Sequence, residues 1–177
     1  MTAAVTSATR TAAAPEWLAA GSEVLYREAL YLDTQRWDEW LELFEPDCEY
    51  WVPAWKSEHQ PTTNPKRELS LIYYATRGGL EDRVWRARSG KSAAAMPLPR
   101  THHVIGNVLL DEAGPERLKL LSAWTAHQYR TKLRETELLY GRYEHELLLR
   151  DGAWRIAKKK IYLLNDTMPA MVDFYSL

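Results

Sequence analysis

Cysteine is almost absent from this sequence, since Cys48 is the single cysteine among 177 residues. One thiol cannot form a disulfide within the chain. It also cannot supply the several thiolates, or the mixed cysteine and histidine set, of a zinc or iron–sulfur site. Because Cys48 lies close to Tyr50 and Val52 in an alternating stretch, we expect it to be a buried structural thiol.

A long hydrophobic run is missing as well, so the sequence predicts no membrane-spanning helix. The opening residues, MTAAVTSATRTAAAPEW, lack the apolar centre of a secretory signal. We expect a flexible arm over residues 1–14 and a single domain over residues 15–177, in a cytoplasmic protein.

An excess of one charge is also absent, because 23 basic and 24 acidic residues give a formal net charge of −1. This balance gives nucleic-acid binding little electrostatic support, and we expect neither a nucleic-acid nor a membrane partner. The run Lys158-Lys159-Lys160 lies inside a strand-like stretch, so we interpret it as a solvated strand or an interface edge.

Tryptophan and tyrosine, by contrast, are abundant: the chain has 8 Trp and 10 Tyr but only 2 Phe. These side chains favour interfaces and half-wet pockets, and a Trp-rich core is the alternative. Two apolar stripes with helical spacing predict a helix over about 16–33 and a short second helix that Pro46 ends. The stripes consist of Leu18, Leu25, Ala29 and Leu32, and of Trp37, Trp40, Leu41 and Phe44.

The rest of the chain is rich in predicted strands. An alternating strand runs through CEYWVPAW, a short helix through LEDRVWRARSG, and Asp151-Gly152 predicts a tight hairpin turn. In the third of the long strands, Tyr143 and His145 belong to the apolar face. Helices followed by long strands predict an α+β fold in which a long, curved, mostly antiparallel sheet curls around the helices like a cone. The long strands are expected at 101–110, 117–130, 137–149 and 153–164.

Two histidines stand side by side in the predicted strand RTHHVIGNVLL. Successive strand residues point to opposite faces, so His102 and His103 cannot both bind one metal ion in the usual way. The other histidines, His59, His127 and His145, form no spaced metal-binding motif. We expect one ring of the pair to be hydrogen-bonded inside the sheet and the other to meet solvent or a partner. A site of two histidines and one carboxylate remains an alternative.

Acid–base chemistry is a second alternative, because a cone-shaped fold can enclose a pocket. A histidine–aspartate pair with tyrosines could abstract a proton from a small molecule or dehydrate it. The candidate residues are Asp47, Tyr50, His102 or His103, and Tyr143.

Four motifs in order carry a family resemblance: DCEYWVPAW, SLIYYATRGGLEDRVWR, PRTHHVIGNV and GRYEHELLLRDGAWRIAKKKIYLLND. With the helices before them, they resemble the small (β) subunit of aromatic-ring-hydroxylating dioxygenases, which are Rieske non-haem iron oxygenases. The resemblance is closest to the benzoate/anthranilate branch and covers about residues 23–177. His102 takes the variable position of the family's R-T-x-H-x-I-x-N, and Gly106 stands where a serine is common. That motif falls on Arg100, Thr101, His103, Ile105 and Asn107.

The resemblance implies an NTF2-like (cystatin-like) cone and a division of labour between subunits. The large (α) subunit would carry the Rieske 2Fe–2S cluster and the mononuclear Fe(II), and a separate reductase would supply electrons from NADH. This chain would be a non-catalytic, structural small subunit without catalytic, cofactor-binding or metal-binding residues of its own. It would also associate with itself as a trimer, within an α3β3 assembly acting on an aromatic carboxylate-type substrate.

Two other functions stay open. The chain could be a stand-alone NTF2-like dehydratase or isomerase that uses the His/Asp/Tyr pocket, or an interaction domain with no oxygenase partner. For self-association, the stretch GGLEDRVWRAR offers Trp85 among Arg83, Arg86 and Arg88 as a candidate interface.

Overall fold

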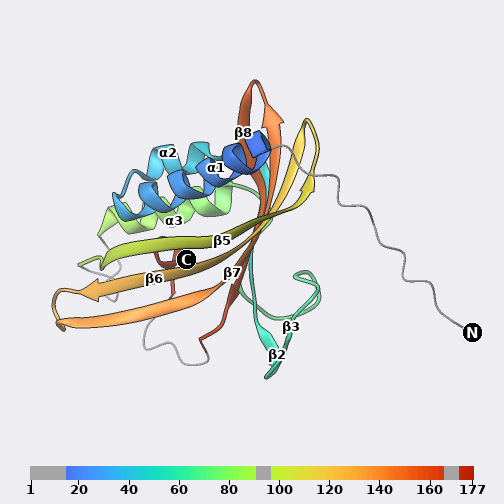
Figure 1. Ribbon diagram of the computed structural model, residues 1–177. Coiled ribbons are helices and arrows are strands. Elements are labelled where there is room, and N and C mark those ends of the chain that lie inside the picture. Colours follow the sequence, from blue (N-terminus) through green and yellow to red (C-terminus); the bar gives the residue numbers. More distant parts are fainter. Residues whose placement is uncertain (1–14, 91–96, 166–171) are drawn as a thin grey trace, which may run out of the picture.

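In the part of the chain that the structure describes, three α-helices pack against a six-stranded sheet (Figure 1). The computed structural model describes residues 15–90, 97–165 and 172–177, so the predicted arm over 1–14 lies outside the described residues. The elements in chain order are α1 (Pro15–Asp33), α2 (Trp37–Glu42), β1 (Phe44–Pro53), β2 (Trp55–Ser57), β3 (Gln60–Pro61), β4 (Ser70–Tyr74), α3 (Gly78–Ser89), β5 (Arg100–Ala113), β6 (Arg117–Arg130), β7 (Glu135–Arg150), β8 (Ala153–Leu163) and the 3-10 turn η1 (Phe174–Ser176).

The large sheet has the strand order β4-β1-β8-β7-β6-β5, and β2 pairs with β3 in a separate two-stranded sheet. All neighbours in the large sheet are antiparallel except β1 and β8, which run parallel. The four long strands predicted from residue 101 onward are confirmed as β5 to β8. The turn between β7 and β8 is confirmed too, because Asp151 and Gly152 have φ angles of 51° and 80°, the two positive values of a type I′ hairpin turn.

The helices follow the predicted stripes with two exceptions. Leu25, Ala29 and Leu32 are buried in α1, whereas Leu18 in its first turns is 37% exposed. The second helix ends at Glu42, earlier than predicted, and Pro46 lies within β1. Pro46 is exposed there, and the register of β1 against β8 is irregular between Phe44 and Glu49, which accommodates a residue that donates no ladder hydrogen bond. No helix in the described ranges is long and apolar enough to cross a membrane.

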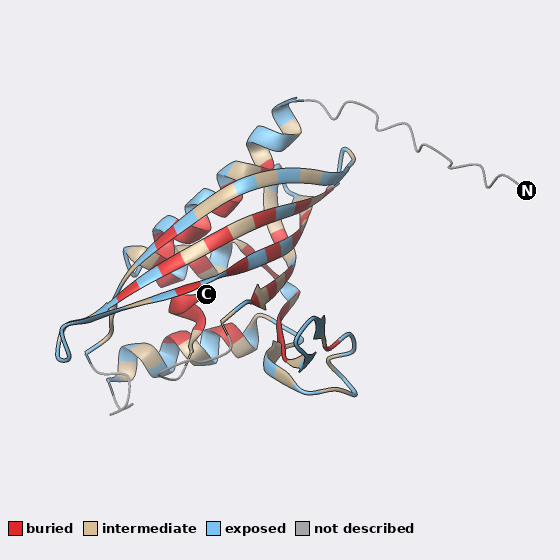
Figure 2. Cartoon of the chain, turned by 60° about the horizontal axis from the view of Figure 1, so that its bottom comes forward, coloured by how far each residue is buried: buried red, intermediate tan, exposed pale blue. Residues whose placement is uncertain are grey.

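The core lies between the helices and the concave face of the sheet. Along β7, buried and exposed residues alternate (Figure 2). Leu139, Tyr143 and Leu147 belong to the buried face. At the centre of the core, the Trp40 ring lies 5.0 Å from the Phe44 ring, centroid to centroid. Cys48 is a fully buried free thiol in the same core cluster, as predicted.

The two edges of the large sheet differ. Helix α1 lies along the edge strand β5, while β4 forms the other edge. β5 also carries an irregularity in its pairing with β6 between Gly106 and Leu109, where Asn107 has a φ of 51°. Asparagine tolerates this left-handed conformation better than most residues, which explains its place in the R-T-x-H-x-I-x-N motif. The bulge begins after Gly106, on the same strand as the histidine pair.

Candidate functional site

The histidine pair of β5 meets the last residue of α1. The Nδ1 atom of His103 lies 2.6 Å from Oδ1 of Asp33, and the backbone N–H of His103 donates to Oδ2 of Asp33 at 2.8 Å. Burial alone would raise the pKa of Asp33, but the bonds from His103 outweigh it and lower that pKa below its usual value. Asp33 is therefore a carboxylate, and Nδ1 of His103 is the donor. The Asp33 carboxylate thus accepts two hydrogen bonds, one from the His103 ring and one from a backbone N–H at the edge of β5.

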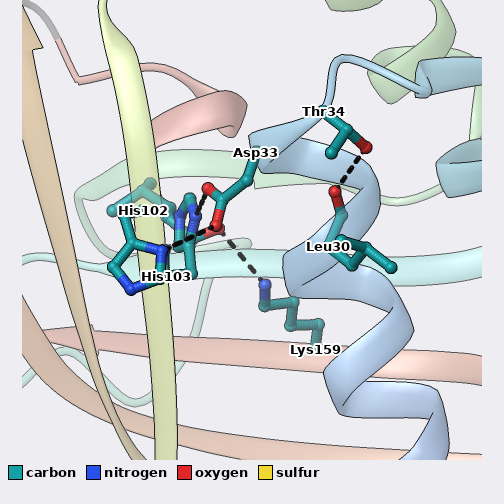
Figure 3. Close-up of polar contacts among 7 residues, drawn as sticks. Leu30, Asp33, Thr34, His102, His103 and Lys159 are labelled. Atoms are coloured by element: carbon teal, nitrogen blue, oxygen red, sulfur yellow. Dashed lines mark hydrogen bonds and ion pairs between the residues drawn. The ribbon is translucent and has the colours of Figure 1, made fainter.

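The two rings differ in burial as the strand alternation predicts, since the side chain of His103 is 1% exposed and that of His102 is 74% exposed. They nevertheless approach the same carboxylate, because Asp33 lies beside the edge of β5 rather than on one face of it (Figure 3). The Nδ1 atom of His102 is 3.7 Å from Oδ2 of Asp33. On its other side, the His102 ring faces His127 of β6 at a centroid distance of 6.4 Å.

A second polar cluster lies inside the cone. Lys159 of β8 donates through Nζ to Oε1 of Glu28 at 2.9 Å, and Nε2 of His145 on β7 lies 3.2 Å from Oε2 of the same carboxylate. All three side chains are at most 3% exposed. The Lys159 ammonium also lies 4.3 Å from the centre of the Tyr143 ring and 5.8 Å from that of Tyr50. Helix α1 and strands β1, β7 and β8 therefore meet at one buried ion pair.

The charges of this cluster depend on one another. Burial would raise the pKa of Glu28, but the Lys159 ammonium and the bond from His145 outweigh it and bring that pKa to about 2. Burial lowers the pKa of His145 and of Lys159, with Glu28 opposing the shift in both. Glu28 and Lys159 form a charged pair, while His145 is a neutral ring that donates through Nε2.

The predicted acid–base residues do not form one site. Asp47 is exposed on β1. The carboxylate beside His103 belongs to Asp33 instead. The two candidate tyrosines, Tyr50 and Tyr143, are buried inside the cone, and burial raises the pKa of both well above its usual value.

Sequence reasoning missed the acidic and basic partners of both clusters. Glu28 follows Leu25 by three residues on the buried stripe of α1, which is a signal for an inward carboxylate. Lys159 has the same strand parity as Ile161 and Leu163, so the interpretation of the lysine run as a solvated strand or an interface edge is wrong for its middle member. Three consecutive lysines show no alternation of polar and apolar residues, so the sequence does not reveal that the middle one points inward.

The candidate interface on α3 is exposed in part. Trp85 is 65% exposed, and Arg86 and Arg88 are exposed beside it. Arg88 pairs with Asp38 of α2 at 2.8 Å, and Arg83 turns inward to Asp173 at 3.1 Å. Of the four candidate residues, Trp85 and Arg86 are exposed and lie outside these two ion pairs.

Comparison with known proteins agrees with the motifs. A family model described as "Ring hydroxylating beta subunit" matches residues 27–170. The 2-halobenzoate 1,2-dioxygenase small subunit of Burkholderia cepacia is 38% identical over 85% of this chain and 90% of its own length. The anthranilate 1,2-dioxygenase small subunit of Acinetobacter baylyi is 38% identical over 87% of this chain and 93% of its own.

A solved structure matches the fold as well. The crystal structure of the β subunit of the benzoate 1,2-dioxygenase from Burkholderia mallei covers 90% of this chain and 97% of its own, with a TM-score of 0.75 and 32% sequence identity. The predicted α+β cone is thereby confirmed.

Proposed function

Because this chain belongs to the ring hydroxylating β-subunit family, we propose that it is the small, structural subunit of a multicomponent aromatic-ring-hydroxylating oxygenase. The observation that carries the proposal is the family match over residues 27–170, together with relatives named as small or β subunits. Those relatives are named for 2-halobenzoate, anthranilate and benzoate, so the substrate class we propose is an aromatic carboxylate.

The proposal places the redox centres in another chain. The Rieske cluster and the mononuclear Fe(II) belong to the large subunit, which takes electrons from NADH through a separate reductase. The donor chemistry of this chain supports that division: burial raises the pKa of Cys48 to about 12, whereas iron binds thiolates. In the described ranges, no three or more His, Cys, Asp or Glu side chains are grouped to hold a metal ion. We assign no catalytic, cofactor-binding or metal-binding residue to this chain.

The proposed assembly is α3β3, with the small subunits also associating as a trimer. The exposed Trp85 and Arg86 of α3 support an interface there, because tryptophan and arginine are enriched at protein–protein contacts. A stand-alone acid–base function is not favoured. The His103 ring is 1% exposed, so no substrate reaches its Nε2 atom without displacement of the core.

Co-expression with the large subunit tests the proposal. A tag on this chain should co-purify a larger chain that holds the iron, and the isolated small subunit should be colourless and free of stoichiometric iron. Metal analysis of both preparations, before and after chelator treatment, is the measurement. The proposal fails if the tagged chain captures no large subunit, or if the isolated chain holds about one iron that chelators do not remove.

A further inference from the structure

Residues 172–177 lie inside the cone. Phe174 and Ser176 are 1% exposed and Leu177 is fully buried, so the chain end at η1 sits between the helices and the concave face of the sheet (Figure 1). The segment belongs to neither sheet. Its backbone hydrogen bonds in this stretch join Ser176 to Asp173 and Leu177 to Phe174, at 2.9 Å and 3.3 Å. Side chains rather than a strand ladder hold it in place.

The Phe174 ring provides an aromatic part of that contact. The Phe174 ring lies 5.7 Å from the Trp37 ring and 5.0 Å from the Trp40 ring, centroid to centroid. Both tryptophans come from α2 and are at most 4% exposed. A buried aromatic side chain that packs against two indoles is similar to the aromatic anchor that a bound peptide places in a pocket of its receptor.

One oxygen of the segment meets the buried charge cluster. The Lys159 ammonium donates to the main-chain oxygen of Leu177 at 3.3 Å, which is a long hydrogen bond, and to Glu28 at 2.9 Å. At the other end of the segment, Asp173 pairs with Arg83 of α3. These two polar contacts of the segment are therefore a long hydrogen bond and one ion pair. In both, the segment contributes an oxygen atom, which another molecule could also supply.

Donors around the segment lack acceptors. Among the described residues, the indole N–H groups of Trp37 and Trp40 and the hydroxyl of Tyr50 are buried without a hydrogen-bond partner. A buried donor without an acceptor costs about 1–3 kcal/mol, and native cores keep few of them. An indole N–H can only donate, so these groups fit a molecule that brings oxygen acceptors.

We propose that the interior of the cone beside Trp37, Trp40 and Lys159 is a binding site for a small aromatic compound with a carbonyl or carboxylate oxygen, and that residues 172–177 occupy this site as an internal ligand. The aromatic ring takes the place of Phe174, and its oxygen-bearing group accepts from the Lys159 ammonium, as the Leu177 main-chain oxygen does, and from the indole N–H of Trp40. The site opens when the segment leaves as a unit. This inference goes beyond the structural role of the subunit and does not depend on it.

Hydrogen exchange on the full chain, in the assembly in which it purifies, tests the opening. The backbone N–H groups of Ser176 and Leu177 should exchange at least about tenfold faster than that of Tyr143 in the core, because a separable segment opens without global unfolding. Equal rates at the two places would mean that the segment opens only with the whole fold, and the proposal would be wrong.

A chain lacking residues 172–177 tests the site itself. The shortened chain should stay folded by circular dichroism and bind a synthetic peptide of sequence VDFYSL, with its melting temperature restored. A matched peptide with Phe174→Ala should bind at least about tenfold more weakly, since it lacks the anchor.

Two probes then identify the ligand class on the shortened chain. Benzoate or benzamide should displace the peptide, and their comparison separates a carboxylate from a neutral carbonyl oxygen. Trp40→Phe keeps an aromatic ring but removes the indole N–H, so it should weaken the displacing probe. The proposal is overturned if the shortened chain does not fold, if it folds but ignores the peptide, or if neither probe displaces the peptide.

Discussion

At the scale of single residues, the contact between Asp33 and His103 is best understood as a clamp between α1 and β5. The carboxylate of Asp33 accepts from both the ring and the backbone N–H of His103, which ties a helix end to a sheet edge. A general base needs an accessible atom that can take a proton from substrate. The buried ring of His103 offers none, so stability rather than chemistry should depend on it.

Replacement of His103 by alanine separates these roles. His103→Ala should leave a cavity and one less bond to Asp33, and lower the free energy of unfolding by roughly 1–3 kcal/mol. It should also weaken assembly, while the intact complex that still forms keeps its iron and most of its turnover. Thermal melting and oxygenase turnover, normalised to assembled complex, are the measurements.

His102→Ala is the matched control, because its ring is 74% exposed and its loss should change stability by less than about 0.5 kcal/mol. Loss of a true general base would lower the rate by about 10²–10⁴-fold with the fold intact. A folded, assembled and iron-loaded His103→Ala complex with turnover down about a thousandfold would show that the histidine is catalytic.

The buried lysine makes a second prediction at this scale. Lys159→Met leaves the Glu28 carboxylate in the core without its ammonium, and should cost about 3–5 kcal/mol of unfolding free energy. Glu28→Gln added to it should recover most of the loss, since no charge then stays buried. Lys158→Met, one residue away on the exposed face, should change little. Urea unfolding of all four chains checks this, and equal losses at Lys158 and Lys159 would contradict it.

At the scale of elements, the alternation of residues along a strand predicted which side chains of β7 are buried. Tyr143 and His145 were expected inside β7 from alternation alone, and both are buried there. Period-two patterning needs only local sequence, because neighbouring strand residues always point to opposite faces. The same rule correctly separated His103 from His102.

The pairing of charges could not be predicted in this way. Asp33 and His103 are 70 residues apart, and Glu28 and Lys159 are 131 residues apart, on different elements. Which carboxylate meets which base depends on how α1 crosses the sheet, and no local pattern contains that information. Asp47 is the predicted acidic candidate and Asp33 is the actual partner of His103, because the sequence does not reveal which acidic residue lies beside β5.

Helix α3 gives a prediction at the element scale. Trp85→Ala should weaken self-association of the small subunit by at least about tenfold, because exposed tryptophans at protein contacts are often dominant residues. The monomer should lose less than about 0.5 kcal/mol of stability. Sedimentation velocity over a concentration series is the measurement. Tyr26→Ala on α1, which removes a 49% exposed aromatic ring elsewhere, is the control, and equal effects would mean that α3 is not the interface.

At the scale of the whole molecule, the cluster around Glu28 couples stability to pH. The pKa of His145 is lower in the folded state than its usual 6.5, mainly because the ring is buried. The pKa of Glu28 is also lowered, from 4.5 to about 2. For both groups the unfolded chain binds protons first as pH falls, so both contribute stability that is present near neutrality and lost on acidification. His145 loses its contribution below about pH 6.5, and Glu28 between about pH 5 and pH 2.

His145→Gln should therefore flatten the first part of this acid response. We expect the free energy of unfolding of the parent chain to fall between pH 7 and pH 5, by at most about 1.4 kcal/mol per pH unit for one proton. Glutamine can still donate a hydrogen bond to Glu28 but binds no proton. The free energy of unfolding of the variant should therefore change little over that range and fall only at lower pH, as Glu28 titrates.

Urea unfolding at pH 7, 6 and 5 measures how steeply the free energy of unfolding of each chain depends on pH. His127→Gln, at an exposed position on β6, is the control and should keep the parent slope. If the His145→Gln and His127→Gln chains lose stability equally between pH 7 and pH 5, the neutral buried imidazole is not the group that senses acid.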